Sequence, residues 1–352
     1  MATKTPPYLL ILAITVVALV AAAWWWVIHK PMGFLDPEYG VWLAKLKMAD
    51  TPQPPGTIVI LGDSCTVADL VPPLIGRDVL DLGLGGACPV EEYFMALRLL
   101  RTNHPRAVVL SFIPANLARI NRTGSHVNIL DRGSKFGLLD WTDLEQIRQR
   151  SRALRDNSIF DRPAPLDMDA RLKIWLLAHR FPAYYFADLI GGQLDLWKRE
   201  NPRRLLFTEQ TRGYFGGHGA LQAGALDWNA SLVDFRPPPT IDFYFRQLLA
   251  LFAARGIPVY FVSMPMSDVS LAAMRPEVKQ AYTSYLKELA SSYPNFHELG
   301  DPLPSFPLRY YHDDIHLATA GAILWSRRIR DILIAGNLDP GPVDPRWQLP
   351  AD

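Results

Sequence analysis

Residues 57–65 read Thr-Ile-Val-Ile-Leu-Gly-Asp-Ser-Cys, so a short β-branched run ends in a glycine and small polar residues. A brief apolar run without alternating polar positions is typical of a strand that is buried on both faces of a parallel sheet. Similar runs follow at Ala107–Phe112 and Ile257–Val262, and weaker ones lie at Val79–Leu82 and Phe296–Leu299. The sequence therefore predicts an α/β fold built on a mainly parallel sheet.

Helical patterns alternate with these runs. They occupy Pro89–Arg101, Thr240–Arg255 with Thr240 as the expected N-cap, Pro276–Ala290, and Ala318–Ala335, which Gly336 ends. Because parallel strands need crossover connections, these helices are expected to cover both faces of the sheet and to give three layers, α/β/α.

Residues 123–236 interrupt the alternation. Helical patterns near 140–155 and 167–198 are followed by a Gly-rich, aromatic stretch at 212–219. We expect an insertion here that shapes a substrate cleft or a lid. The predicted divisions of the chain are a tail and anchor at 1–30, a juxtamembrane helix and Pro-rich linker at 31–56, the α/β domain at 57–336, and a C-terminal tail at 337–352.

Charge and composition exclude several classes of protein. The chain has 352 residues, of which 49% are apolar, and 36 Lys and Arg face 35 Asp and Glu. This apolar content excludes a disordered chain. Near-neutral charge argues against a nucleic-acid partner, because binding to phosphates needs a basic surface.

An uncharged stretch near the N-terminus indicates a membrane segment. Tyr8–Ile28 would form a helix about 31 Å long, close to the thickness of a bilayer's hydrocarbon core. Trp24–Trp26 stand at its C-terminal end, where aromatic rings favour the headgroup region. Ala21–Ala23 also offers a signal-peptide cleavage pattern, but three tryptophans directly after a cut would be unusual. We therefore favour a retained anchor with its short tail inside and the bulk of the chain outside the cytoplasm.

Four polar or Gly-rich segments follow the predicted strands or precede the last helix. They are Gly62-Asp63-Ser64, Gly83–Gly86, Asn116 and Asp313-Asp314-Ile315-His316. In parallel sheets the functional groups gather beyond the carboxyl ends of the strands, so these segments are expected to converge on one rim.

The order of these segments resembles the SGNH (GDSL-like) hydrolase superfamily. Its blocks are matched by Gly62-Asp63-Ser64, by Gly86, by Asn116 and by the D-x-x-H of Asp313–His316. The resemblance covers about residues 57–122 and 240–336. In the third block the expected glycine of G-x-N is replaced by Pro114, so Asn121 is an alternative to Asn116. The long insertion is more similar to membrane-anchored members that modify cell-envelope polymers, some of which work beside a membrane-bound O-acyltransferase.

These residues have the chemistry that acyl transfer needs. Ser64 is the candidate nucleophile, and His316 is the candidate base because imidazole titrates near neutral pH. Asp313, one helical turn earlier, would hold the productive tautomer of His316. The backbone N–H groups of Ser64 and Gly86 and the side-chain amide of Asn116 would form the oxyanion hole.

Other interpretations of the same residues remain open. Ser64 is also suited to cap a helix, and Gly83–Gly86 to form a tight turn. Gly83–Cys88 resembles half of a dinucleotide fingerprint, although Cys88 stands where Gly or Ala is expected. His312, Asp313, Asp314 and His316 include metal-ligand types, but no further cluster completes a set, so neither metal nor cofactor is predicted.

The two cysteines follow the nucleophile and the oxyanion glycine. If both loops meet at one rim, Cys65 and Cys88 are placed to form a disulfide in an oxidising compartment. Two small buried thiols are the alternative.

The functional expectation is a membrane-anchored, extracytoplasmic serine esterase or O-acyltransferase that acts through an acyl-enzyme on Ser64. Acyl groups, acetyl above all, of a cell-envelope polysaccharide or glycolipid would be the substrate. The expected location is the inner (cytoplasmic) membrane with a single pass and a periplasmic catalytic domain. The expected partners are the bilayer and an integral-membrane O-acyltransferase. The alternative is a catalytically inactive SGNH-like subunit that binds or assembles a polysaccharide-modifying complex.

Overall fold

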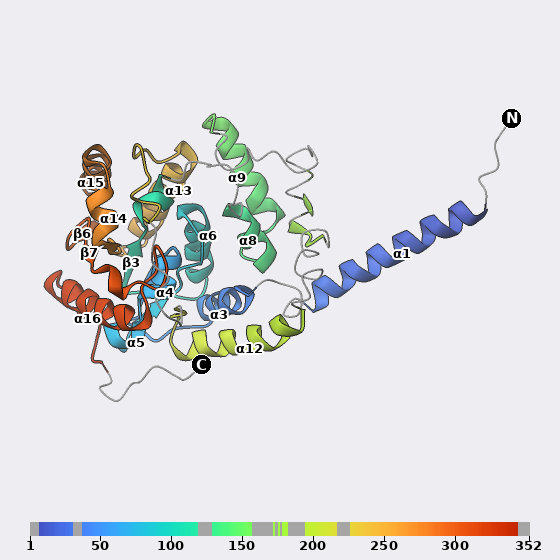
Figure 1. The fold of residues 1–352 in the computed structure, drawn as a ribbon, viewed down its shortest axis with the longest axis horizontal. Helices are drawn as coiled ribbons and strands as arrows, with labels where there is room; N and C mark the ends of the chain where they lie inside the picture. The colour runs from blue at the N-terminus through green and yellow to red at the C-terminus, as the bar shows by residue number, and fades with distance from the viewer. Residues whose placement is uncertain are drawn as a thin grey trace.

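A five-stranded parallel sheet forms the centre of the computed structural model, which describes residues 7–30, 37–118, 129–156, 172, 175–176, 178–181, 194–216 and 226–343 (Figure 1). The strand order is β2-β1-β3-β4-β6, and every pairing is parallel. The strands are β1 (Ile58–Gly62), β2 (Val79–Asp81), β3 (Ala107–Ser111), β4 (Val259–Val262) and β6 (Phe296–Leu299). The predicted α/β architecture is confirmed.

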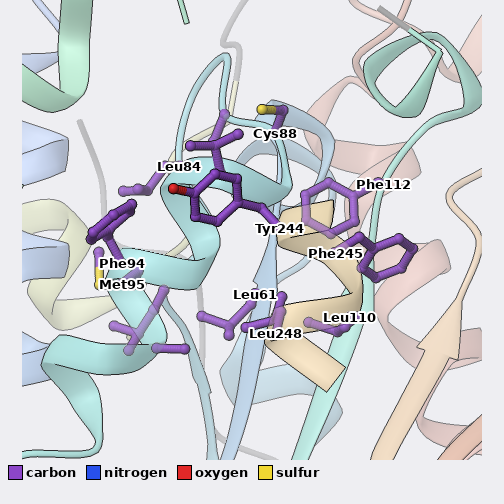
Figure 2. Packing of buried hydrophobic residues seen from close by; sticks show 14 of the residues in the cluster. Leu61, Leu84, Cys88, Phe94, Met95, Leu110, Phe112, Tyr244, Phe245 and Leu248 are labelled. Carbon is purple, nitrogen blue, oxygen red and sulfur yellow. The ribbon is translucent and has the colours of Figure 1, made fainter. Parts of the chain in front are cut away.

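Helices cover both faces of this sheet. One face is covered by α3 (Tyr39–Asp50), α6 (Pro89–Leu99), α13 (Pro239–Ala253) and α15 (Pro276–Ser292), and the other by α4 (Ser64–Asp69), α5 (Pro72–Ile75) and α16 (Thr319–Ala335). The alternation of side chains along β1 separates the two cores, because Leu61 packs in the first and Ile60 in the second. Figure 2 shows the first core, where Leu61 and Leu110 face Leu248 of α13.

Short elements complete the rim of the sheet. They are α7 (Pro114–Leu117), the two-stranded pair of β5 (Met266–Ser267) and β7 (Ser305–Phe306), α14 (Asp268–Ala273) and the 3-10 turn η2 (Leu308–Tyr310). They follow or flank the carboxyl ends of the sheet's strands, where the polar segments of the sequence also lie.

One predicted helix start differs from the structure. Helix α13 begins at Pro239 with Pro238 as its N-cap, so Thr240 lies inside the first turn. Proline suits this position because its fixed φ is helical and its missing N–H would have no partner in the helix. The Thr240 N–H is instead accepted by Asp156 Oδ2 at 2.7 Å, so the insertion supplies the cap.

The insertion contributes three helices within the described residues, namely α8 (Ile129–Phe136), α9 (Trp141–Ala153) and α12 (Leu194–Gln210). Helix α12 lies along α3 (Figure 1). Gly40 allows this approach, because a Cβ there would collide with the Asn201 carbonyl oxygen. Most of the helical pattern predicted at 167–198, and part of the Gly-rich stretch with His218, lie outside the described residues.

The N-terminal helix α1 (Pro7–His29) projects from the α/β domain (Figure 1). Its mean hydropathy reaches 2.4 over an 18-residue window, of which 6% is buried. By length and composition this helix is able to cross a bilayer, and a signal sequence would meet the same criteria.

Candidate active site

Ser64 is the first residue of helix α4, directly beyond the carboxyl end of β1. The turn needs a close approach of β1 to β3, and Gly62 permits it because a Cβ there would collide with the Ser111 carbonyl oxygen. Asp63 is the N-cap of α4, and its Oδ1 accepts the Cys65 N–H at 3.0 Å. Strand end, cap and helix start therefore fix the position of Ser64 on the rim.

The other oxygen of Asp63 ties this turn to the next one. Asp63 Oδ2 accepts the Ile113 N–H at 2.9 Å and the Asn116 side-chain amide at 2.8 Å. The carboxyl is fully buried, and burial raises its pKa although these hydrogen bonds act in the opposite direction. Asp63 thus shapes the serine turn and also joins it to α7.

His316 reaches the serine from the loop before α16. Its Nε2 lies 2.8 Å from Ser64 Oγ, across 252 positions of sequence, and its Nδ1 lies 2.8 Å from Asp313 Oδ2. Asp313 Oδ1 also accepts the backbone N–H of Ile315 and of His316, at 2.9 and 2.7 Å. An ionised carboxylate only accepts hydrogen bonds, so Nδ1 carries the proton and Nε2 is left to accept that of Ser64.

Charges and hydrogen bonds in this loop shift the pKa values of Asp313 and His316. Burial acts to raise the pKa of Asp313, but the hydrogen bond and charge of His316 and the two backbone N–H groups lower it to about 2. Burial acts to lower the pKa of His316, but the hydrogen bond to Asp313 and the charges of Asp69, Asp313 and Asp63 raise it above its usual range. Asp313 is therefore ionised at neutral pH, whereas His316 titrates above 6.5.

The predicted oxyanion donors lie on the loops beside this serine. The Leu84 N–H donates to the Gly62 carbonyl at 2.9 Å, which brings the loop of Gly86 against the end of β1. Gly86 has φ of +74°, a left-handed conformation that favours glycine. Asn116 is 4% exposed and uses one amide N–H on Asp63, which leaves a second N–H on the same nitrogen. Asn121 lies outside the described residues.

The expected disulfide is not present in the structure, because Cys65 and Cys88 are both buried thiols without a disulfide bond. Cys65 points from α4 into the core under α16, where its Sγ lies 3.8 Å from the Ile315 carbonyl oxygen. Cys88 caps α6 and belongs to the opposite core (Figure 2). Its Sγ lies 3.3 Å from Glu91 Oε2. Their loops share a rim, but the side chains enter different layers.

Two of the four residues in the metal interpretation already serve each other as side-chain partners. Asp313 and His316 are paired, and the His312 N–H donates to the His316 carbonyl at 2.8 Å. Across the described ranges, no three His, Cys, Asp or Glu side chains gather as a metal site.

Sequence reasoning missed several buried polar groups that support these loops. Asp69 accepts the Leu317 N–H at 2.8 Å, and Asn229 accepts the Ala115 N–H at 2.8 Å from the end of the insertion. Lys45 of α3 pairs with Asp81 at 2.9 Å, and both side chains are fully buried. Asp81 lies directly at the end of a strand, and an acidic residue at this position could have been recognised in the sequence as a buried polar group. The contacts of Asp69 and Asn229 join distant segments and leave no local pattern in the sequence.

Comparisons with known proteins add little to this geometry. No family model matches the chain, and no curated protein matches its sequence. One solved structure that resembles it is a lipase/acylhydrolase from Enterococcus faecalis, at 14% identity, with 81% of this chain and 99% of that chain covered and a TM-score of 0.24. An alignment of this quality establishes no activity, so the function is inferred from the side chains of the site.

Proposed function

We propose that this protein is a serine esterase or O-acyltransferase of the SGNH type, with Ser64 as nucleophile, His316 as base and Asp313 as its orienting carboxylate. One observation carries the proposal: Ser64 Oγ, the His316 ring and Asp313 Oδ2 form a continuous hydrogen-bonded chain with two links of 2.8 Å. A serine hydroxyl becomes an effective nucleophile when a base in this position takes its proton.

The proposed reaction has two halves. Ser64 Oγ attacks the carbonyl carbon of an ester while its proton passes to His316 Nε2. The bond to the alcohol then breaks, Nε2 returns the proton to the leaving oxygen, and the acyl group stays on Oγ. In the second half His316 Nε2 deprotonates the acceptor as it attacks the acyl carbon. The bond between that carbon and Oγ then breaks, and Nε2 returns the proton to Oγ, which regenerates Ser64. Water as acceptor makes the protein an esterase, and a sugar hydroxyl makes it an O-acyltransferase.

The tetrahedral intermediates need hydrogen-bond donors for their negative oxygen. We assign this role to the backbone N–H groups of Ser64 and Gly86 and to the Asn116 amide. The bond between Asn116 and Asp63 supports the assignment, since it holds the amide next to the serine turn. Each donor of this kind is worth about 2.7–4 kcal/mol of transition-state stabilisation.

The same proposal places the enzyme on the outer side of the inner membrane. Helix α1 would be the single span, with the α/β domain in the periplasm. Near the C-terminal end of α1, Trp24 Nε1 donates to the His179 carbonyl at 2.7 Å. The Trp24 ring also contacts the rings of Trp175 and Phe181. These contacts support a membrane-proximal aromatic cluster shared by the helix and the insertion, because tryptophan favours the headgroup region.

An anchored enzyme of this kind would meet envelope substrates. We propose acyl groups, acetyl above all, on a polysaccharide or glycolipid as the substrate, and an integral-membrane O-acyltransferase as the partner that exchanges acyl groups with Ser64. The anchor supports this proposal because it keeps the site beside the membrane where such substrates are assembled.

A fluorophosphonate probe tests the chemistry directly, because it reacts with activated serines. We expect stoichiometric labelling of the full-length protein in detergent, loss of labelling in Ser64→Ala, and loss of ester turnover in the same variant. The exposed Ser231, whose Oγ donates to the Trp228 carbonyl, supplies the control Ser231→Ala. A folded wild type that does not react would favour the inactive binding subunit. An acyl group trapped on Ser64 then identifies the donor, and its discharge by water or by sugar separates esterase from transferase.

A further inference from the structure

Asp69 is a buried carboxyl that the proposed reaction does not use. It is the last residue of α4, the helix that begins with Ser64, and none of its surface is exposed. Its Oδ1 accepts the backbone N–H of Leu317 at 2.8 Å, and Leu317 directly follows His316. One short helix therefore carries the nucleophile at its first residue. At its last residue it contacts the segment 311–318, which precedes α16 and carries His316 and which we call the base loop.

Three contacts hold the base loop along this helix. Ser64 Oγ meets His316 Nε2 at the start of α4, and Cys65 Sγ lies 3.8 Å from the Ile315 carbonyl oxygen. The first contact belongs to the chemistry and the second is a weak thiol interaction. The Asp69 hydrogen bond is the strong link that remains when the serine is acylated and its hydroxyl no longer engages the imidazole.

Among the described residues, no cationic side chain forms a salt bridge with Asp69. Across the described residues, no hydrogen-bond partner meets Asp69 Oδ2, which is also buried. Burial raises the pKa of this carboxyl to about 8, with the charge of His316 and the Leu317 N–H acting against the rise and Asp313 and Asp63 adding to it. A polar group that is buried with so little compensation is costly, which points to a purpose other than stability.

We propose that Asp69 is a positioning residue, which fixes the separation of Ser64 and His316 by holding the Leu317 N–H against the end of α4. This inference rests on the proposed function, because it assigns Asp69 a task only if Ser64 and His316 exchange a proton. Misplacement of a catalytic group by 1 Å can cost about 100-fold in rate, so a single backbone contact next to His316 is sufficient to matter.

The side chain needed at this position is an acceptor, and a negative charge is not required. Asp69→Asn keeps an oxygen for the Leu317 N–H, whereas Asp69→Ala removes it. Without the acceptor, the loop is expected to sample positions in which Nε2 does not reach Oγ. Substrate binding would change little and the chemical step would slow, so kcat falls while KM stays.

A matched control exists on the same interface. Ser326 Oγ of α16 accepts the Val71 N–H at 2.8 Å and is fully buried, and its bonds do not involve the base loop. Ser326→Ala therefore also leaves a buried backbone N–H near α4 without its acceptor, at a cost to stability of about 1–3 kcal/mol. A loss of activity that follows from weaker packing alone would occur in both alanine variants.

The experiment compares the four full-length proteins, wild type and the three variants, in ester turnover and in the rate constant of fluorophosphonate labelling, with Tm measured for each. We expect Asp69→Ala to lower kcat and the labelling rate by about 10- to 100-fold with KM unchanged. Asp69→Asn should stay within about 3-fold of wild type, and Ser326→Ala should match wild type in rate despite its lower Tm.

Three results would overturn the proposal: wild-type rates in Asp69→Ala, equal losses in Asp69→Ala and Ser326→Ala, or equal losses in Asp69→Asn and Asp69→Ala. If Asp69→Ala does not fold, hydrogen exchange in the wild type decides, since the Leu317 amide must then be strongly protected. Failure of the proposed function is distinguishable, because it leaves Ser64→Ala with the activity and labelling of the wild type.

Discussion

Two loops of the site rest on buried carboxyls that are stabilised in different ways. Under the loop of Gly86, Asp81 accepts the Gly83 N–H at 2.7 Å and pairs with Lys45 at 2.9 Å. Under the loop of His316, Asp69 accepts the Leu317 N–H at 2.8 Å. All three of these side chains are fully buried, but only Asp81 has a salt-bridge partner among the described residues.

The two carboxyls are expected to affect different properties: Asp81 the stability of the domain, and Asp69 the rate of the reaction. Burial pushes both Asp81 and Lys45 toward their neutral forms, and the charge of each partner opposes this effect. Removal of one partner of such a pair strands a buried charge, so the loop of Gly86 is tied to the stability of the whole domain. The loop of His316 is instead joined to the end of α4 by a hydrogen bond from its Leu317 backbone N–H, so loss of Asp69 is expected to perturb it locally.

The largest effect is expected within the base loop itself. Asp313→Asn should lower kcat by about 10⁴-fold, because the imidazole loses the group that fixes its tautomer. Asp313 also raises the pKa of His316. Since neutral His316 is the working form, activity rises as pH climbs through this pKa, and residual activity in the variant should begin at lower pH. Asp331→Asn, at an exposed position of α16, is the control for loss of one charge. A pH–rate profile that does not move would contradict the assigned roles.

Next in size is the loss of the buried ion pair. Lys45→Met should destabilise the protein by about 3–5 kcal/mol, because Asp81 is left as an uncompensated buried charge. Lys47→Met is the matched control on the same helix, since Lys47 pairs with Glu209 at 2.7 Å but is 61% exposed. That variant should lose about 0–1 kcal/mol in the same denaturant titration. Equal losses of stability in the two variants would show that the buried pair contributes no more to stability than the exposed one.

A smaller, pH-dependent effect distinguishes Asp69 from Asp81. Because the folded state raises the pKa of Asp69 from 3.8 to about 8, it holds a proton that the unfolded chain releases. The contribution of Asp69 to the free energy of unfolding is therefore complete below pH 3.8 and declines as the pH rises toward 8. An asparagine at this position does not titrate, so Asp69→Asn removes that decline. The Tm of Asp69→Asn relative to wild type should therefore increase with pH. Asp81→Asn leaves Lys45 without its counter-ion and should be less stable than wild type at neutral pH. A constant difference for Asp69→Asn would show that Asp69 is ionised throughout.

The smallest effect is expected where the loop of Gly86 meets the insertion. Arg132 Nη1 pairs with Glu38 at 2.8 Å and also donates to the Gly85 carbonyl at 3.2 Å. Both side chains are partly exposed, so Glu38→Gln should cost only about 0.2–1 kcal/mol of stability. Turnover should stay near that of wild type. A large drop in kcat would show that this pair, together with the Lys45–Asp81 pair, sets the position of the loop.

The sequence was sufficient to predict the features that repeat or lie close together in the chain. The runs at 57–61, 107–112 and 257–262 predicted buried parallel strands, which the structure has at 58–62, 107–111 and 259–262. The Gly-Asp-Ser turn and the D-x-x-H segment located Ser64 and His316, which the structure brings together. Their catalytic roles stay predictions until the probe experiment is done.

Contacts between distant segments could not be predicted in this way. The Asp69–Leu317 bond joins residues 248 positions apart, and the Asn229–Ala115 bond joins residues 114 apart. Nothing in the local sequence distinguishes Asp69 from any other polar residue of a helix, or Asn229 from any other polar residue of a loop. The disulfide prediction was wrong for a related reason: adjacency of two loops does not fix the layer into which Cys65 and Cys88 point.

The burial of both thiols has a practical consequence for the membrane question. The chain has two cysteines, Cys65 and Cys88, which are 1% and 0% exposed, and burial raises the pKa of Cys65 well above its usual range. Maleimides react with thiolates and hardly with protonated thiols, so the cysteines of the folded protein should not react with them. A single cysteine placed at an exposed position such as Arg203 would then be the only reactive thiol. Its accessibility to a membrane-impermeant maleimide in intact cells would report on which side of the bilayer the α/β domain lies.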